Sequence, residues 1–84
     1  MDFDRIRKII ASVLGVDVSE VKEETTFIED LGADSLDVYQ IMLKLEEEFE
    51  IHVDAKVIEN IRNVGDVLTL IKEKSLSVRA FHSL

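Results

Sequence analysis

Apolar residues recur at helical spacing near the start of the chain. Between residues 3 and 14 they follow one another at intervals of three and four, so they share one face of a helix. Asp2 or Asp4 can cap the start of this helix, and Gly15 is placed to end it in a left-handed turn. The pattern therefore predicts a first helix over residues 3–14.

The longest helical pattern begins at about Ser35, ends at Glu48 or Phe49, and has two apolar faces. With successive side chains about 100° apart, one face forms the expected core stripe of Val38, Ile41, Met42, Leu45 and Phe49. The other face carries Leu36, Tyr39, Gln40, Leu43 and Glu47, with Glu46 at its edge. A bundle of a few helices cannot easily bury both faces, so we expect the second to be a docking surface. The alternative is that a loop covers Leu36 and Tyr39.

Two shorter helical patterns follow. Asp54 is placed to cap a short third helix that turns Val57, Ile58 and Ile61 inward. Asn63 is placed to cap a fourth helix, which has Lys72 and Lys74 in its last turn. The expected buried stripe of this fourth helix is Val64, Val67, Leu68 and Ile71.

Residues 16–34 show no sustained period and form a long connection. Its single apolar residues are expected to fasten it to the helices, and Ser19 is placed to start a short helical turn through Val21. These anchors are Val16, Val18, Val21, Phe27, Ile28 and Leu31. Because no stretch alternates as a strand does, the sequence predicts an all-α fold. We expect a small four-helix bundle with a long first loop and a short third helix.

The length of 84 residues fits one domain with a small core, which we place at residues 1–74. Residues 75–84 form a tail of uncertain order: extension of the fourth helix, loose packing and disorder all remain open. The N-terminus is charged where a secretory signal is apolar, and no apolar run reaches membrane-spanning length. We therefore expect a cytoplasmic monomer without membrane insertion.

The negative charge of the chain is concentrated in its middle. The net charge is −8, but residues 17–50 hold twelve carboxylates against Lys22 and Lys44, a local net charge of −10. Such a field repels phosphate backbones and steers in partners with basic patches. Nucleic-acid binding is therefore not expected, and protein partners with basic surfaces are.

Ser35 stands at the centre of this acidic stretch. Asp34 and Ser35 are both residues that cap helices, so the serine is expected at or just inside the first turn. Gly32 lets the approaching loop take a backbone conformation closed to other residues. The hydroxyl would then lie at an exposed corner beside unpaired helix N–H groups, which favour an attached phosphate. The alternative is that Asp34 or Ser35 is a helix cap and nothing more.

Other site chemistry finds little support in the sequence. A hydrolytic triad on Ser35 needs a histidine, but His52 follows a helix that begins seventeen residues earlier, on the order of 20 Å away. His82 lies in the tail. The chain has no cysteine, which excludes thiolate metal sites and cysteine nucleophiles, and two isolated histidines do not make a zinc site. We expect no catalytic residues and no metal site.

The stretch Asp30-Leu31-Gly32-Ala33-Asp34-Ser35-Leu36-Asp37 resembles the phosphopantetheine attachment motif of acyl carrier proteins. The similarity is greatest to the stand-alone carriers of fatty acid synthesis and extends over about residues 3–74. It implies a helical bundle of acyl-carrier type. It also implies that a phosphopantetheinyl transferase, using Mg²⁺, transfers the 4'-phosphopantetheine arm of coenzyme A to Ser35. The thiol of the arm would then carry growing acyl chains as thioesters.

The resemblance also implies three groups of site residues. Asp34 and Leu36 flank the attachment serine. Enzymes that act on the acyl chain would dock on Leu36, Asp37, Tyr39, Gln40, Leu43, Glu46 and Glu47. Acyl groups would be sheltered by Phe27, Val38, Ile41, Met42, Leu45, Val53, Ile58 and Ile61. The implied docking residues include those that the helical pattern leaves unburied.

The sequence departs from the family pattern at several positions. Gln40 stands where an acidic residue is usual, Lys44 replaces a small residue, and Asp54 replaces a common proline. Ile58 is larger than the residue often found there, which would shrink an acyl cavity. Two alternatives therefore stay open: a specialised carrier of polyketide, amino-acyl or other cargo, and an unmodified acidic module that only binds proteins.

Overall fold

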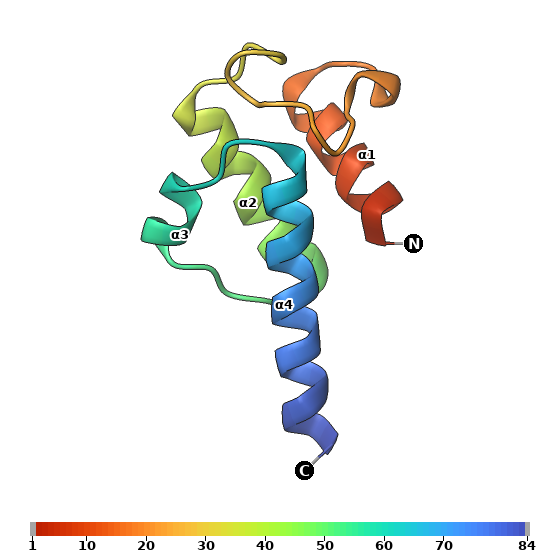
Figure 1. The fold of residues 1–84 in the computed structure, drawn as a ribbon, viewed down its shortest axis with the longest axis vertical. Coiled ribbons are helices and arrows are strands. Elements are labelled where there is room, and N and C mark those ends of the chain that lie inside the picture. The colour runs from red at the N-terminus through yellow and green to blue at the C-terminus, as the bar shows by residue number, and fades with distance from the viewer. Residues whose placement is uncertain (1, 84) are drawn as a thin grey trace.

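The computed structural model describes residues 2–83, with side chains described for residues 3–74. Over this range the chain forms four α-helices and one short 3-10 turn (Figure 1). They are α1 (Asp2–Leu14), η1 (Val18–Glu20), α2 (Ser35–Phe49), α3 (Ala55–Glu59) and α4 (Val64–Ser83). The all-α bundle with a long first connection and a short third helix is confirmed.

The helix ends follow the local sequence. Gly15 adopts φ +69°, and the Val16 N–H donates to the Ala11 carbonyl at 3.1 Å, which closes α1 in the left-handed turn expected of glycine. The start of α4 is capped by Asn63, whose side chain accepts the Asp66 N–H at 2.8 Å. The predicted bounds of α2 are also those observed.

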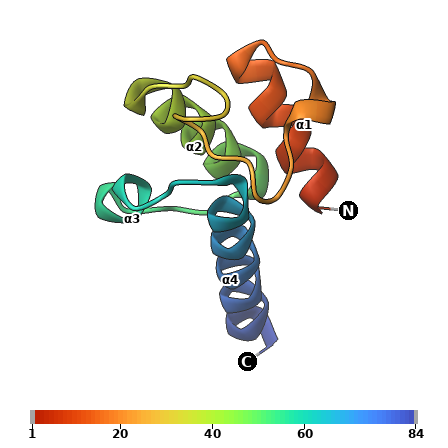
Figure 2. The same cartoon turned by 45° about the horizontal axis from the view of Figure 1, so that its top comes forward.

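The fourth helix is longer than the sequence pattern indicated. It continues without a break to Ser83, so Lys72 and Lys74 lie in its middle and not in its last turn. Of the three possibilities for the tail, the structure shows helix extension. In both views the C-terminal part of α4 projects beyond the other helices (Figures 1 and 2). The division of the chain at residue 74 stays a prediction.

The core lies where the helical faces predicted it. Val38, Ile41, Met42 and Leu45 of α2 are buried, and Phe49 packs against them at the edge. The α4 stripe of Val64, Val67, Leu68 and Ile71 is buried as well, together with Leu70. From the other segments, the core includes Ile6, Ile10, Ala11, Val21, Phe27, Ala33, Val53, Ile58 and Ile61.

Two apolar residues predicted to face inward do not. Ile28 is 66% exposed, because the adjacent Phe27 takes the core position and neighbouring residues of the turn point in different directions. Val57 is 37% exposed, because α3 has only five residues and turns a single side chain, Ile58, into the core.

Three predicted caps were also wrong or incomplete. Asp2 and Asp4 both lie inside α1, which begins at Asp2, so neither precedes the helix as a cap. The turn in the first connection covers Val18–Glu20, and its cap is Asp17 instead of Ser19: the Ser19 N–H donates to the Asp17 carboxylate at 2.9 Å. Asp54 precedes α3, but its side chain makes no capping hydrogen bond there.

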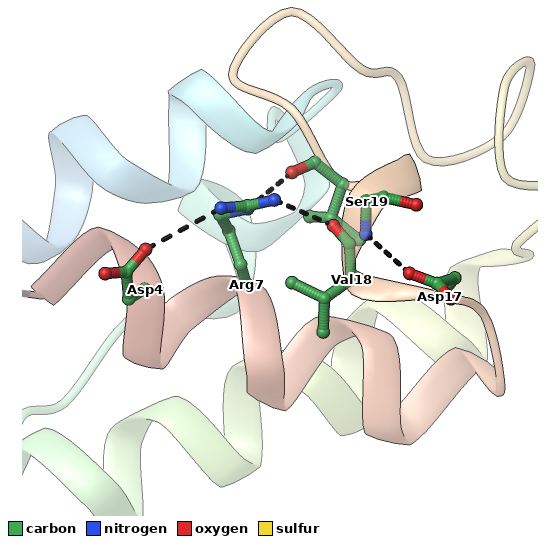
Figure 3. Close-up of polar contacts among 6 residues, drawn as sticks. Asp4, Arg7, Asp17, Val18 and Ser19 are labelled. Carbon is green, nitrogen blue, oxygen red and sulfur yellow. Dashed lines mark hydrogen bonds and ion pairs between the residues drawn. The ribbon is translucent and has the colours of Figure 1, made fainter.

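The long first connection is held at both of its ends. On one side, the Arg7 guanidinium donates to the carbonyls of Val21 at 2.8 Å and Val18 at 3.0 Å, as Figure 3 shows in part. On the other side, the Phe27 N–H donates to the Arg62 carbonyl at 3.0 Å, next to the start of α4. The connection is therefore a packed element that fixes the entry into α2.

Candidate functional site

The approach to α2 is built from a glycine and a buried alanine. Gly32 adopts φ +65°, a left-handed conformation that favours glycine. Its N–H donates to the Ile28 carbonyl at 3.2 Å, and the Ala33 N–H donates to the Phe27 carbonyl at 2.9 Å. With Ala33 buried, the chain is fixed immediately before the helix and its direction at Asp34 is defined.

Asp34 is the cap of α2. Its carboxylate accepts the Asp37 N–H at 2.9 Å, and the Asp37 carboxylate accepts the Asp34 N–H at 3.1 Å. This reciprocal pair is a capping box, with aspartate in place of the usual glutamate at the third helical position. Capping is thus performed by Asp34, so Ser35 becomes the first residue inside the helix.

Ser35 is exposed and its hydroxyl is not used by the fold. None of the hydrogen bonds in the described part of the chain involves that hydroxyl or the N–H groups of Ser35 and Leu36. Free N–H groups in the first turn of a helix bind anions. An accessible hydroxyl beside two such donors fits a phosphodiester-linked group.

The second face of α2 is exposed at its apolar positions. Leu36 is 71% exposed and Leu43 is 61% exposed, while Gln40 and Glu47 lie in solvent between and beyond them. Tyr39 is half-buried and packs against the core, whereas the prediction that a loop covers Leu36 is wrong. The exposed apolar strip therefore runs from Leu36 to Leu43.

Two acidic residues of the predicted docking set also have partners in the fold. Glu46 is only 17% exposed, and its carboxylate accepts the Val53 N–H at 3.1 Å. The same oxygen lies 3.4 Å from His52 Nδ1. Asp37 belongs to the capping box. The docking roles of Asp37 and Glu46 stay predictions. The hydrogen bonds that both residues make within the fold were not predicted from the sequence.

The residues predicted to line an acyl site are all buried, and three of them border a hollow at the surface of the described residues. Phe27, Val38 and Ile61 line a space of about 520 Å³ between the first connection, α2 and the segment after α3. Ile28, predicted to be a buried anchor, forms part of the same wall, as do the exposed Glu59 and Arg62. The other five predicted residues are buried in the core: Ile41, Met42, Leu45, Val53 and Ile58.

Asp30, in the turn just before the site, has a lowered pKa. The Thr26 N–H donates to Asp30 at 2.8 Å, and this bond, helped by the Thr26 hydroxyl, holds the pKa of Asp30 below its ordinary value. The Asp30 N–H in turn donates to the Thr26 hydroxyl at 3.1 Å. Asp30 thus remains ionised and fastens the turn that leads to Ser35.

His52, the histidine considered for a hydrolytic site, lies beside two carboxylates. His52 is next to Glu46 and Asp54, with its Nε2 3.7 Å from the Asp54 carboxylate. Among the described residues no group of three potential ligands could hold a metal ion. The side chain of His82 lies outside the described side chains. Within the described helices, none is long and apolar enough to cross a membrane.

Comparisons with known proteins agree with this geometry. Residues 4–71 match the model of the phosphopantetheine attachment site family. The chain is 47% identical over 72 residues to the acyl carrier protein of Clostridium acetobutylicum, covering 86% of this chain and 94% of the relative. It is 48% identical over 71 residues to the acyl carrier protein of Chlamydia caviae, covering 84% of this chain and 92% of that relative.

A solved structure shows the same fold. The acyl carrier protein of Thermotoga maritima superimposes with a TM-score of 0.78 at 32% identity, over 88% of this chain and 86% of that one. The match to the family model extends from α1 into α4 and so contains the whole site described above. The family is one of carriers, and its cofactor is 4'-phosphopantetheine. The chain therefore belongs to the phosphopantetheine attachment family, as an acyl carrier protein.

Proposed function

We propose that Ser35 is the attachment residue and that the chain carries growing acyl groups in fatty acid biosynthesis. The observation that carries this proposal is that the cap of α2 and the exposed hydroxyl belong to two different residues, Asp34 and Ser35. Asp34 caps the helix, so the neighbouring Ser35 hydroxyl is left exposed and unbonded. A serine that served as the cap would have its oxygen occupied by a helix N–H.

The residues around Ser35 have distinct tasks in this proposal. Phosphopantetheine, when bound, supplies a thiol that forms thioesters with acyl groups. The chain has no cysteine and so has no thiol of its own. The N–H groups of Ser35 and Leu36 are placed to bind phosphate oxygens. The capping box of Asp34 and Asp37 keeps the serine in the first turn. These are tasks of a carrier and not of an enzyme.

The attachment is tested by intact mass after incubation with coenzyme A, Mg²⁺ and a phosphopantetheinyl transferase. We expect the gain of one phosphopantetheine group, lost in Ser35→Ala and kept in Ser12→Ala. Ser12 is an exposed helical serine of α1 and controls for modification at any accessible hydroxyl. No gain in the wild-type chain, or a gain that survives in Ser35→Ala, would contradict the proposal.

Partner enzymes are proposed to dock on the exposed strip of α2. Leu36, next to Ser35, and Leu43, about two turns further along α2, supply apolar contacts, and Glu47 supplies charge for a basic patch. The phosphopantetheinyl transferase and the enzymes that act on the acyl chain are the partners this surface fits. The monomeric state and the cytoplasmic location stay predictions from the sequence.

The two alternatives from the sequence are separated by simple measurements. An unmodified protein-binding module would show no mass gain with coenzyme A and the transferase. A specialised carrier would gain the same arm but hold a different group, which the mass of the acylated protein isolated from its cells would identify. Ile58 is buried and is larger than the residue usual at this position, which would leave less room for an acyl group. This observation favours a specialised cargo.

A further inference from the structure

A groove between α1 and α2 adjoins the exposed strip of α2. The two helices pack side by side (Figures 1 and 2), and residues of both line two hollows of about 480 and 280 Å³. Lys44 and Glu47 belong to both hollows, which therefore adjoin along α2. The apolar side chains that line them are Ile9 and Val13 of α1 and Leu43 of α2. We call this surface the α1–α2 groove.

Lys44 gives the α1–α2 groove a charge unlike that of the rest of α2. It is the one cation of this helix, whose other charged residues are Asp37, Glu46, Glu47 and Glu48. Its side chain is exposed, at one of the positions where the chain departs from the family pattern. A positive charge within a strongly negative surface changes which partners that surface accepts.

The neighbours of Lys44 on the helix do not neutralise it. A lysine in a helix pairs with acids three or four residues away, which here are Glu47 and Glu48. The Glu48 carboxylate instead lies 2.6 Å from the Arg5 guanidinium, which is also 5.0 Å from the centre of the Phe49 ring. Among the described side chains, no ion pair includes Lys44 or Glu47. Both exposed charges are therefore available to a partner.

The α1–α2 groove fits a protein segment with three kinds of side chain. An apolar side chain packs between Val13 and Leu43. Glu47 attracts a basic residue, while Lys44, one helical turn away, attracts a carboxylate and repels a second base. A partner that presents basic residues alone is penalised at Lys44, because like charges brought together across an interface weaken binding.

We propose that the α1–α2 groove is an interaction surface of this chain, and that Lys44 selects partner enzymes with a carboxylate beside their basic patch. The inference rests on the proposed function, because these partners are enzymes that reach the arm on Ser35. Lys44 lies nine residues after Ser35, about 14 Å along α2. An interface of standard size, with about 800 Å² buried on each partner, covers both positions. One enzyme can thus contact the strip at Leu36 and the groove at the same time.

The charge reversal Lys44→Glu tests the inference through the sign of its effect. Calorimetry measures binding to two purified enzymes from the cells that make this chain. These are the phosphopantetheinyl transferase, with the apo chain, and the enzyme that elongates the acyl chain, with the arm-bearing chain. For at least one of them, we expect Lys44→Glu to raise the Kd about tenfold and Lys44→Arg to leave it near the wild-type value. Tighter or unchanged binding of both enzymes to Lys44→Glu would overturn the inference, because a uniformly basic patch prefers glutamate to lysine.

Lys56→Glu is the matched control for this reversal. It makes the same change in net charge at an exposed lysine of α3, and Lys56 lines neither hollow of the groove. An equal rise of the Kd in Lys56→Glu would overturn the inference, because the effect would then come from total charge. If Lys44→Glu fails to fold, Lys44→Gln replaces it, with a smaller rise of the Kd expected and a fall or no change contradicting the inference.

Chemical cross-linking locates the contact itself. A water-soluble carbodiimide condenses an amine and a carboxylate that touch into an amide. In the complex that Lys44→Glu weakens, we expect a link from Lys44 to a carboxylate of the enzyme, identified by mass spectrometry after digestion. Links from Glu47 to lysines of the enzyme, with none from Lys44, would overturn the inference. A chain that never acquires the arm would instead contradict the attachment at Ser35.

Discussion

Arg7 holds Val21 through a hydrogen bond of 2.8 Å from its Nε to the Val21 carbonyl, and thereby ties the first connection to α1. A second nitrogen of the same guanidinium donates to the Val18 carbonyl at 3.0 Å. The side chain is partly buried and also lies 5.5 Å from the centre of the Phe3 ring. Only a planar group with several donors satisfies both carbonyls at once.

Arg7→Lys is expected to lower the free energy of unfolding by about 1.5 kcal/mol, because lysine keeps the charge but loses the two-carbonyl fork. Urea unfolding measures the change. Arg5→Lys is the matched control on the same helix: Arg5 pairs with Glu48 at 2.6 Å in solvent, where such a pair contributes little. Equal losses in the two variants would contradict the role assigned to Arg7.

The capping box makes a second prediction about stability. Asp34→Ala should lower the free energy of unfolding by about 1 kcal/mol, because the Asp37 N–H loses its acceptor. Ser35→Ala should change the same quantity by less than about 0.5 kcal/mol, since the hydroxyl supports nothing in the fold. Thermal or denaturant unfolding of the apo chain measures both. A larger loss in Ser35→Ala than in Asp34→Ala would mean that the serine is the cap.

Much of this fold could be predicted because its helices are amphipathic and locally capped. The α2 bounds and both core stripes follow from helical spacing alone. The choice between Asp34 and Ser35 as cap was left open, although an acid three residues after Asp34 is the signal of a capping box. The exposure of Ile28 was missed because a stretch without period does not show which of two adjacent apolar residues turns inward.

Other parts of the site depend on contacts between distant residues. Glu46 belongs by position to the edge of the docking face, but the Val53 N–H binds it after the chain has turned back. The eight residues predicted to line an acyl site are buried, as expected, yet only backbone placement decides that Phe27, Val38 and Ile61 reach a hollow. The sequence pattern identifies which residues are buried. It does not show where spaces remain between them.

Glu46 and Glu47 are adjacent in sequence but should respond differently to substitution. Glu47→Lys is expected to weaken association with a partner that presents a basic patch, with the free energy of unfolding changed by less than about 0.5 kcal/mol. Glu46→Ala should cost about 1–3 kcal/mol of folding stability, because the Val53 N–H loses its acceptor.

Calorimetric binding to the phosphopantetheinyl transferase and urea unfolding separate these two effects. Leu43→Ala should behave as Glu47→Lys does, since its side chain is exposed. A large loss of folding stability in Leu43→Ala or Glu47→Lys would show that this face of α2 is structural. Unchanged binding in both variants would remove it from the docking surface.

The acid sensitivity of the chain should depend on two carboxylates of the first connection. Hydrogen bonds from the N–H, and secondarily the hydroxyl, of Ser19 and Thr26 hold the pKa of Asp17 and of Asp30 below the ordinary value of 3.8. A lowered pKa in the folded state means that the ionised form stabilises folding. The contribution is complete above pH 3.8 and is lost as the pH falls through the lower folded value.

Replacing both carboxylates, in Asp17→Asn with Asp30→Asn, should therefore flatten the fall of folding stability on the acid side. Urea unfolding from about pH 5 downwards measures this slope. Glu24→Gln in the same connection is the control, because it removes one charge without these hydrogen bonds. Since Asp17 and Asp30 are exposed, solvent limits the size of the effect and the slope is the quantity to compare. An acid limb as steep in the double variant as in the wild-type chain would mean that other carboxylates govern acid unfolding.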